Sequence, residues 1–146
     1  MSAFRMYLRI VSTTLSPEDI TTRLGTQPDE AYAMGSRRRP ELPERGHTSW
    51  MRRATVPEPG ARPEDLEPVV LSWGRAFADA VGALADSGDA DVSLVLVQSI
   101  RDLGSPAEKG IPLGAELIAW LGAARAGLDI DQYVFHDCEP ESDGPV

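Results

Sequence analysis

The sequence of 146 residues has a single cysteine, Cys138. No disulfide can therefore form within the chain, and a zinc site built from several thiolates is excluded. Long hydrophobic runs are also absent, because no segment approaches the roughly 20 apolar residues that span a bilayer. The N-terminal segment lacks the apolar stretch of about 7–15 residues that a secretory signal contains. We therefore expect a soluble, cytoplasmic protein that does not enter a membrane.

Lysine is almost missing, since Lys109 is the only one among 14 basic residues, and 23 acidic residues give a net charge of -9. An acidic chain of this kind disfavours binding to nucleic acid, which requires a cationic surface to release counterions from the phosphates. The same charge is compatible with a basic protein partner.

The common catalytic motifs are absent: the sequence contains no P-loop, G-x-G-x-x-G, H-E-x-x-H or G-x-S-x-G pattern. His136 lies two residues before Cys138, but no residue nearby is placed to orient it for nucleophilic catalysis. Only two histidines are present, and no second Cys/His pair stands at metal-ligand spacing. We expect no metal and no cofactor, and the sequence favours a protein that is not an enzyme.

The composition that remains is typical of a globular domain, with 42% hydrophobic and 25% charged residues. The length fits one hydrophobic core. We therefore predict a single α+β domain over residues 1–137, followed by an acidic, frayed tail over residues 138–146.

Hydrophobic periodicity and capping residues predict the elements of this domain. Strict alternation over residues 4–11 indicates a strand with one face in the core. Ser16 as N-cap, Pro17 in the first turn and Gly25 after the last turn indicate a short helix between them. The other expected elements are strands over residues 31–34, 48–56, 91–100 and 129–136, and helices over residues 66–88 and 113–127.

Gly74 and Gly82 interrupt the long helix predicted over residues 66–88. A glycine inside a helix costs about 1 kcal/mol relative to alanine. The alternative is that these glycines permit close packing of the helix on a sheet.

The order of elements predicts a mainly antiparallel sheet of four or five strands with about three helices packed on it. The segments "LSPEDITTRLG" and "LGAELIAWLGA" each follow a strand and a loop, which suggests a weak internal repeat and a ferredoxin-like sandwich as one form of this class. A doubly wound parallel sheet is disfavoured, because no glycine-rich turn joins a strand to a helix.

A basic segment stands out in the acidic chain, because six of the 14 basic residues lie between positions 37 and 53. Arginine side chains bind carboxylates and phosphates through two parallel hydrogen bonds, so the segment is a candidate site for an anion or a partner. The alternative is a solvated loop that pairs with the acidic tail. The candidate residues are Arg37, Arg38, Arg39, Arg45, His47, Arg52 and Arg53.

Trp50 lies within the same segment and has two possible roles. With His47 and the arginines it could form the aromatic floor of an anion-binding pocket. A large aromatic residue in a strand is more often a core residue, and we favour that role.

A second candidate surface is acidic and consists of Asp129, Asp131 and Glu139. Together with the basic segment it favours a protein-binding or accessory domain, such as an immunity-type protein that neutralises a basic toxin. Neutralising these carboxylates should then weaken the binding of the partner. The alternatives are a domain that binds anions or phosphorylated metabolites, a minor enzyme that uses the basic segment, and a homodimer with paired sheet edges or helices.

Several scattered positions between residues 5 and 135 match the pattern of a bacterial family. They include a Pro-Glu-Ile helix that ends in Leu-Gly, a tryptophan strand and a closing Leu-Gly and Ile-Asp-x-Tyr segment, although extra residues separate "LG" from "LDID" here. The positions are Pro17, Glu18, Ile20, Leu24, Gly25, Pro28, Gly35, Trp50, Leu121, Gly122, Ile130, Asp131 and Tyr133. In these residues the chain resembles the family known as domain of unknown function 4279. The resemblance implies a small, stand-alone, cytoplasmic bacterial protein and transfers no catalytic residue, and only analogy links such families to conflict systems or accessory roles.

Overall fold

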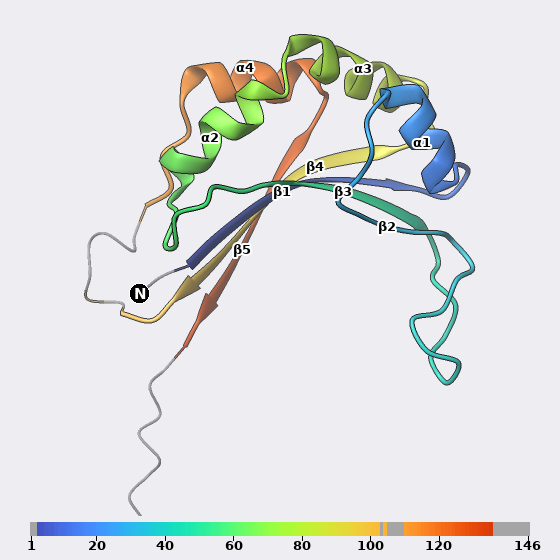
Figure 1. The fold of residues 1–146 in the computed structure, drawn as a ribbon, viewed down its shortest axis with the longest axis horizontal. Coiled ribbons are helices and arrows are strands. Elements are labelled where there is room, and N and C mark those ends of the chain that lie inside the picture. The colour runs from blue at the N-terminus through green and yellow to red at the C-terminus, as the bar shows by residue number, and fades with distance from the viewer. Residues whose placement is uncertain (1–2, 103, 105–109, 136–146) are drawn as a thin grey trace, which may run out of the picture.

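The computed structural model describes residues 3–102, 104 and 110–135, in which a five-stranded sheet carries four helices on one face (Figure 1). The strands lie in the order β2-β3-β1-β4-β5. This arrangement confirms the predicted α+β class. The elements are β1 (Ala3–Ser12), α1 (Pro17–Leu24), β2 (Glu30–Tyr32), β3 (Thr48–Ala54), α2 (Pro63–Ser72), α3 (Arg75–Asp86), β4 (Asp91–Ile100), α4 (Ala115–Ala123) and β5 (Gly127–Val134).

The sheet is mainly antiparallel, as predicted, but its two halves differ. β1 is antiparallel to both of its neighbours, β3 and β4, whereas β4 and β5 are parallel. The prediction of a ferredoxin-like sandwich with an internal repeat is therefore wrong, because the two halves of the sheet are connected differently. After α1 the chain reverses through β2 and the loop that follows it, and so β3 returns antiparallel to β1. In the second half α4 carries the chain back to the start of β4, which makes β5 parallel.

The core lies between the sheet and the helices. Phe4, Met6, Leu8 and Ile10 of β1 alternate toward the helices and are buried, as the sequence pattern predicted. Trp50 is fully buried beside them, and its indole N–H donates a hydrogen bond of 3.1 Å to Thr21 Oγ1 of α1. The core role of this tryptophan is confirmed.

β4 is buried on both of its faces, as the near-continuous apolar run predicted. Leu94 and Leu96 face the helices, and Val95 and Val97 are buried on the other face of the sheet. Gln98 is also fully buried, and its Oε1 accepts a hydrogen bond of 2.9 Å from Gln132 Nε2 of β5.

The single helix predicted over residues 66–88 is wrong, because the chain breaks between α2 and α3. Gly74 has a φ of +89°, a conformation that ends a right-handed helix and that glycine adopts without strain. Its carbonyl oxygen accepts a hydrogen bond of 3.1 Å from Trp120 Nε1 of α4. The break brings the rings of Trp73, Phe77 and Trp120 together, with centroids 5.9–6.2 Å apart.

Gly82 does permit close packing, but against α4 rather than against the sheet. A Cβ atom built on Gly82 would overlap the carbonyl oxygen of Ala123. This contact falls at the end of α4, which stops at Ala123, short of the predicted end at Gly127. Arg125 then takes a positive φ of 55° and turns the chain toward β5. None of the helices in the described part of the chain is long and apolar enough to cross a membrane.

Helix α1 begins and ends as the sequence predicted. Ser16 Oγ accepts a hydrogen bond of 3.1 Å from the backbone N–H of Asp19, and Asp19 Oδ2 accepts one of 3.0 Å from the backbone N–H of Ser16. Gly25 has a φ of +66° and donates its N–H to the carbonyl of Thr21. The backbone hydrogen bond from Ser16 lowers the pKa of Asp19, and the hydroxyl of Ser16 lowers it further.

Asp89 is a second carboxylate whose pKa is lowered, first by the hydroxyl of Ser87, then by that of Thr14 and by Arg23. Because the pKa values of Asp19 and Asp89 are lower in the folded chain, both groups stabilise the fold above the unfolded value of about 3.8. That stabilisation is lost as the pH falls through the folded values.

We therefore expect urea denaturation to show a steep loss of stability below about pH 4. Asp89→Asn should lower stability at pH 7 and flatten this acid dependence. Asp79→Asn is the matched control, since Asp79 makes only an exposed ion pair with Arg75. An unchanged acid dependence in Asp89→Asn would contradict the assignment.

Candidate functional site

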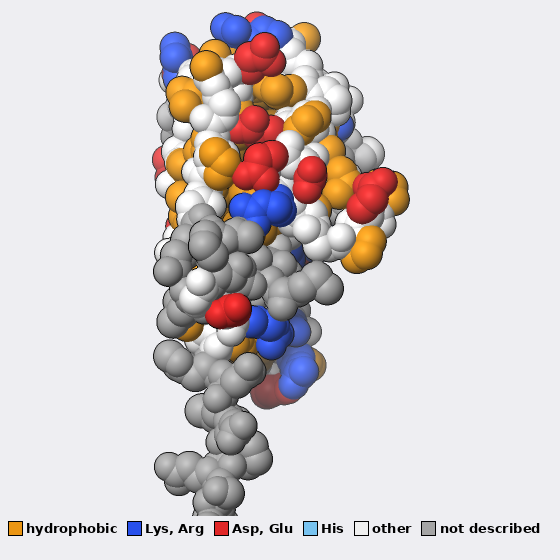
Figure 2. Space-filling model, turned by 90° about the vertical axis from the view of Figure 1, so that its left-hand side faces the viewer, with side chains coloured by type: hydrophobic (Ala, Val, Ile, Leu, Met, Phe, Trp, Pro, Cys, Tyr) orange, Lys and Arg blue, Asp and Glu red, His pale blue; other side chains and the backbone are white. Residues whose placement is uncertain are grey.

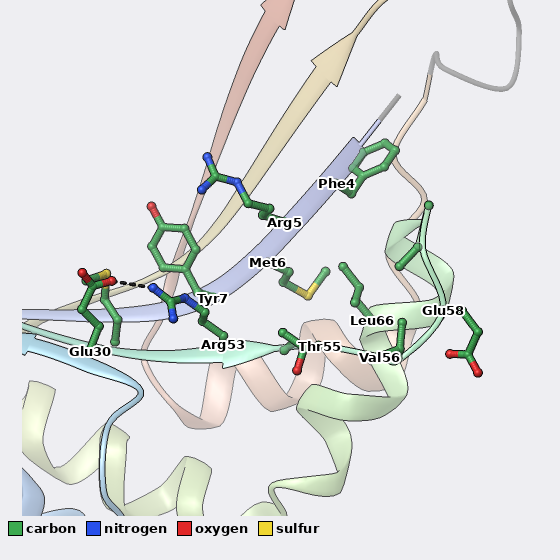
Figure 3. Close-up of a pocket in the computed structure, with 14 residues that line it drawn as sticks. Phe4, Arg5, Met6, Tyr7, Glu30, Arg53, Thr55, Val56, Glu58 and Leu66 are labelled. Atoms are coloured by element: carbon green, nitrogen blue, oxygen red, sulfur yellow. Dashed lines mark hydrogen bonds and ion pairs between the residues drawn. The ribbon is translucent and has the colours of Figure 1, made fainter. Parts of the chain in front are cut away.

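The face of the sheet opposite the helices carries a concentration of basic and aromatic side chains. No helix of the described residues covers this face (Figure 1), and we call it the open face. Figure 3 shows Arg5 and Tyr7 projecting from one side of β1 and Met6 from the other. The open face, defined by strand register, includes Arg5, Tyr7, Arg9, Val11, Glu30, Tyr32, Ser49, Met51, Arg53, Asp91, Ser93, Val95, Val97, Ser99, Gly127, Asp129, Asp131 and Tyr133.

A first hollow of about 340 Å³ lies where β3 ends beside the start of β1 (Figure 3). Arg5, Tyr7, Glu30 and Arg53 line it on the open face, whereas Met6 and Leu66 line it from the helix side of β1. Arg53 Nη2 forms an ion pair of 2.6 Å with Glu30 Oε2. The side chain of Arg5 forms no hydrogen bond or ion pair with any described residue. Arg5 is therefore available to a ligand.

A second hollow, also of about 340 Å³, adjoins the first, and Tyr7 and Met51 line both. In the second hollow the guanidinium of Arg45 lies 4.1 Å from the ring centre of Tyr32. This cation–π contact holds the arginine against the sheet.

Arg9 and His47 meet at the same hollow, where Arg9 Nη2 lies 3.4 Å from His47 Nε2. An arginine can only donate, so Nε2 of His47 is the acceptor in this long hydrogen bond. Arg9 and Arg45 are both half-buried, so their side chains are ordered by neighbours while their N–H groups remain accessible.

The basic segment predicted from the sequence is divided by the fold into three places. Arg37, Arg38 and Arg39 lie on the loop between β2 and β3, which extends beyond the sheet (Figure 1). Arg37 donates to the carbonyl of Leu42 at 2.8 Å and pairs with Glu44 at 3.3 Å. The side chains of Arg38 and Arg39 make no hydrogen bond or ion pair with other described residues, although the carbonyl of Arg39 accepts from the backbone N–H of Leu42 at 3.0 Å.

Arg52 lies on the helix side of the sheet, separated from Arg53 and His47 by the strand itself. Its guanidinium lies 4.6 Å from the ring centre of Trp73 and 4.8 Å from that of Phe77. Burial lowers the pKa of Arg52, and the charge of Asp29 opposes this effect. Of the predicted basic set, only Arg45, His47 and Arg53 therefore belong to the open face or its border.

The sequence prediction missed two residues of this surface, Arg5 and Arg9. The signal was present in the alternation of β1, which places Arg5, Tyr7 and Arg9 together on the side away from the core. Arg9 and Arg5 lie 28 and 32 positions before Arg37, where the basic segment begins, and only the register of β1 with β3 brings them close to that segment.

The acidic residues Asp129 and Asp131 also lie on the open face, on β5. Asp131 is opposite Val97, which is opposite Arg5, so two strand spacings of about 4.8 Å separate the opposite charges. Neither aspartate makes an ion pair with a described residue. The open face therefore has a basic half on β1–β3 and an acidic rim on β5. Glu139, His136 and Cys138 lie outside the described residues.

The helix layer differs in charge from the basic half. Figure 2 shows hydrophobic and acidic side chains, with some basic ones among them, over the side of the molecule on which α2 and α4 lie. The first turns of these helices contribute Glu64, Asp65 and Glu116. Within the described ranges, no three His, Cys, Asp or Glu side chains converge as metal ligands would.

The fold and the site together define an α+β sandwich in which no described helix covers one face of the sheet, and this face divides into a basic half and an acidic rim. The chain belongs to the family described as Domain of unknown function (DUF4279), whose model matches residues 2–135. The match spans every described strand and helix, which confirms the resemblance seen in the sequence. No curated protein and no solved structure matches the chain.

Proposed function

We propose that this protein is a non-enzymatic binding domain that recognises an acidic segment of another protein with the open face of its sheet. The observation that supports this role is the gathering of Arg5, Arg9, Arg45 and Arg53 around two adjoining hollows, in a chain whose net charge is -9. A basic surface on an acidic protein concentrates its attraction for a negatively charged partner at one place.

The geometry of the arginines sets the kind of ligand. Arg5 and Arg9 project from the same side of one strand, four residues apart, so their Cα atoms are separated by roughly 13 Å. Each guanidinium can hold a carboxylate through two hydrogen bonds. Tyr7 between them offers a flat apolar surface to the partner backbone. An extended segment with carboxylates several residues apart meets these requirements.

The acidic rim supports a more specific form of this role. Asp129 and Asp131 would contact basic residues of the same partner, as in an immunity-type protein that neutralises a basic toxin. Complementary charges on both halves fix the orientation of the partner as well as its rate of association.

The test compares two double variants that each remove two positive charges. Arg5→Ala/Arg9→Ala removes charge from the open face, whereas Arg38→Ala/Arg39→Ala removes the same charge from the loop. Affinity purification from the native host should recover one stoichiometric partner. With that purified partner, the open-face variant should bind at least about tenfold more weakly, since 1.4 kcal/mol corresponds to a factor of ten. The loop variant should bind as the wild type does.

Two results would contradict the proposal. One is recovery of no stoichiometric partner by the wild-type protein. The other is an equal loss of affinity in both double variants, because that would indicate a general effect of net charge rather than contact with the open face.

The second hollow favours one other candidate function, the binding of a small phosphorylated anion. Arg9, Arg45, His47 and Tyr32 line a space of about 340 Å³, which accommodates a phosphate group. If this function is correct, inorganic pyrophosphate should raise the melting temperature of the wild type and of Arg39→Ala but not of Arg9→Ala. The absence of any shift in the wild type would exclude it.

A further inference from the structure

Strand β5 is an edge strand that is exposed on both faces. Its pairing with β4 uses the backbone groups of one side, and no described segment pairs with the other side. Natural edge strands are usually protected by charged side chains, lysine above all, by proline or by a bulge. The segment Gly127–Val134 contains neither lysine nor proline, and its only charged residues are Asp129 and Asp131.

Hydrophobic side chains gather at this edge. Of the eight large hydrophobic residues that are exposed in the described part of the chain, six belong to α4, β5 or the residue after β5. Leu128, Ile130 and Val134 project to the helix side, yet each is 41–43% exposed because the helix layer does not extend over them. Ile130 lies beside the buried Leu96 of β4, on the outer side of the sheet. The six residues are Ile118, Leu128, Ile130, Tyr133, Val134 and Phe135.

We propose that β5 pairs with β5 of a second copy of this chain, antiparallel about a two-fold axis at Gln132. The two sheets then form one continuous ten-stranded sheet with the helices of both copies on the same face. The lateral contact leaves the basic half of the open face accessible, so the dimer is compatible with partner binding through the arginines. It uses Asp129 and Asp131 for the second copy, and therefore competes with the contacts proposed above for these two aspartates.

The positions of the aspartates restrict the register, and the apolar residues of β5 favour one of those that remain. A two-fold axis at Asp129 or at Asp131 would set that residue opposite itself in the second copy. An axis at Ile130 would set Asp129 opposite Asp131. Like charges directly opposite each other destabilise a strand pair. An axis at Gln132 avoids all three arrangements and places Ile130 opposite Val134, so that apolar residues meet on the helix side.

Charges are complementary in this register. Asp131 lies opposite Tyr133, whose hydroxyl can donate to the carboxylate, and Asp129 lies opposite Phe135. The guanidinium of Arg101 lies 4.7 Å from the ring centre of Phe135 in the same copy. Each Arg101 would therefore lie beside Asp129 of the second copy. Asp129 and Asp131, which have no ion pair with a described residue in one copy, each gain a polar partner in the dimer.

Sedimentation tests the dimer. The wild type should sediment as a dimer at a concentration of about 100 μM. Ile130→Lys should sediment as a folded monomer at the same concentration, because dimerisation of this variant would bury one lysine from each copy at the paired edge. Leu42→Lys is the matched control, since Leu42 is 38% exposed and lies on the loop between β2 and β3. This variant should remain dimeric. A monomeric wild type, or a dimer that Ile130→Lys does not disrupt, would overturn the proposal.

Disulfide trapping tests the register, in a Cys138→Ser background. Gln132→Cys should form a covalent dimer under mild oxidation, because the two cysteines face each other at the axis. Ile130→Cys should not, since its two copies are four residues, or roughly 13 Å, apart along the strands. Circular dichroism verifies the fold of each variant. Cross-linking of Ile130→Cys, or failure of Gln132→Cys to cross-link, would overturn the register.

Discussion

Trp50→Ala should lower the free energy of unfolding by about 3–5 kcal/mol, the range for removal of a large aromatic side chain from a core. Trp50 is fully buried between β1, β2 and α1, and its indole N–H donates to Thr21 Oγ1 at 3.1 Å. The substitution removes the ring and leaves a cavity that the surrounding backbone can close only in part. Because natural domains are stable by only about 5–15 kcal/mol, this single change should bring the protein close to unfolding.

Urea denaturation followed by circular dichroism measures this effect, with Trp73→Ala as the matched control. Trp73 is half-buried, so its removal should cost clearly less. Thr21→Val separates the hydrogen bond from the packing, and leaving the buried indole N–H without an acceptor should cost about 1–3 kcal/mol. Equal losses in Trp50→Ala and Trp73→Ala would show that Trp50 is not the centre of this core.

Gly82→Ala should destabilise the protein by about 1–3 kcal/mol, although alanine is the better helix former. The added methyl group would overlap the carbonyl oxygen of Ala123, so α3 and α4 would have to move apart. Such a movement would also disturb the nearby turn at Arg125, whose Nε lies 3.3 Å from Asp86 Oδ1 of α3.

Gly122→Ala provides a control within α4 itself. Apart from its chain neighbours and the nearby backbone of α4 itself, no atom lies within 4 Å of a Cβ built on Gly122, and its φ is not positive. Alanine at this position should therefore stabilise the protein by up to about 1 kcal/mol through helix propensity. Thermal and urea unfolding of both variants measure the difference. If the two substitutions shift stability in the same direction, close contact between α3 and α4 does not determine the response.

The sequence predicted those parts of the fold that depend on local pattern. The alternation of β1, the caps of α1 and the apolar run of β4 each carry their own signal, and each was confirmed. The break at Gly74 was missed because apolar residues continue at helical spacing across it. The break also involves a hydrogen bond from Trp120 Nε1 to the Gly74 carbonyl, and a partner 46 residues away in the sequence leaves no local signal.

The candidate site was harder to predict, because neighbours in the sequence are separated by the sheet. Arg52 and Arg53 are adjacent, yet one contacts Trp73 on the helix side and the other pairs with Glu30 on the open face. Conversely, Arg9 and His47 meet although 38 residues separate them. Charge clustering along the chain identified a region, whereas strand register determines which of its charges share a surface.

The parallel pairing of β4 with β5 has a consequence for the synthesis of the protein. β4 receives its last neighbour only after α4 and the segments around it have been made, because β5 begins at Gly127. A nascent chain, or one truncated before that point, would expose the outer edge of β4 with its run of Leu94, Val95, Leu96 and Val97. Uncharged segments of this kind pair readily with other chains. The interval between translation of Ile100 and docking of β5 is therefore the period in which the protein is most exposed to aggregation and most dependent on chaperones.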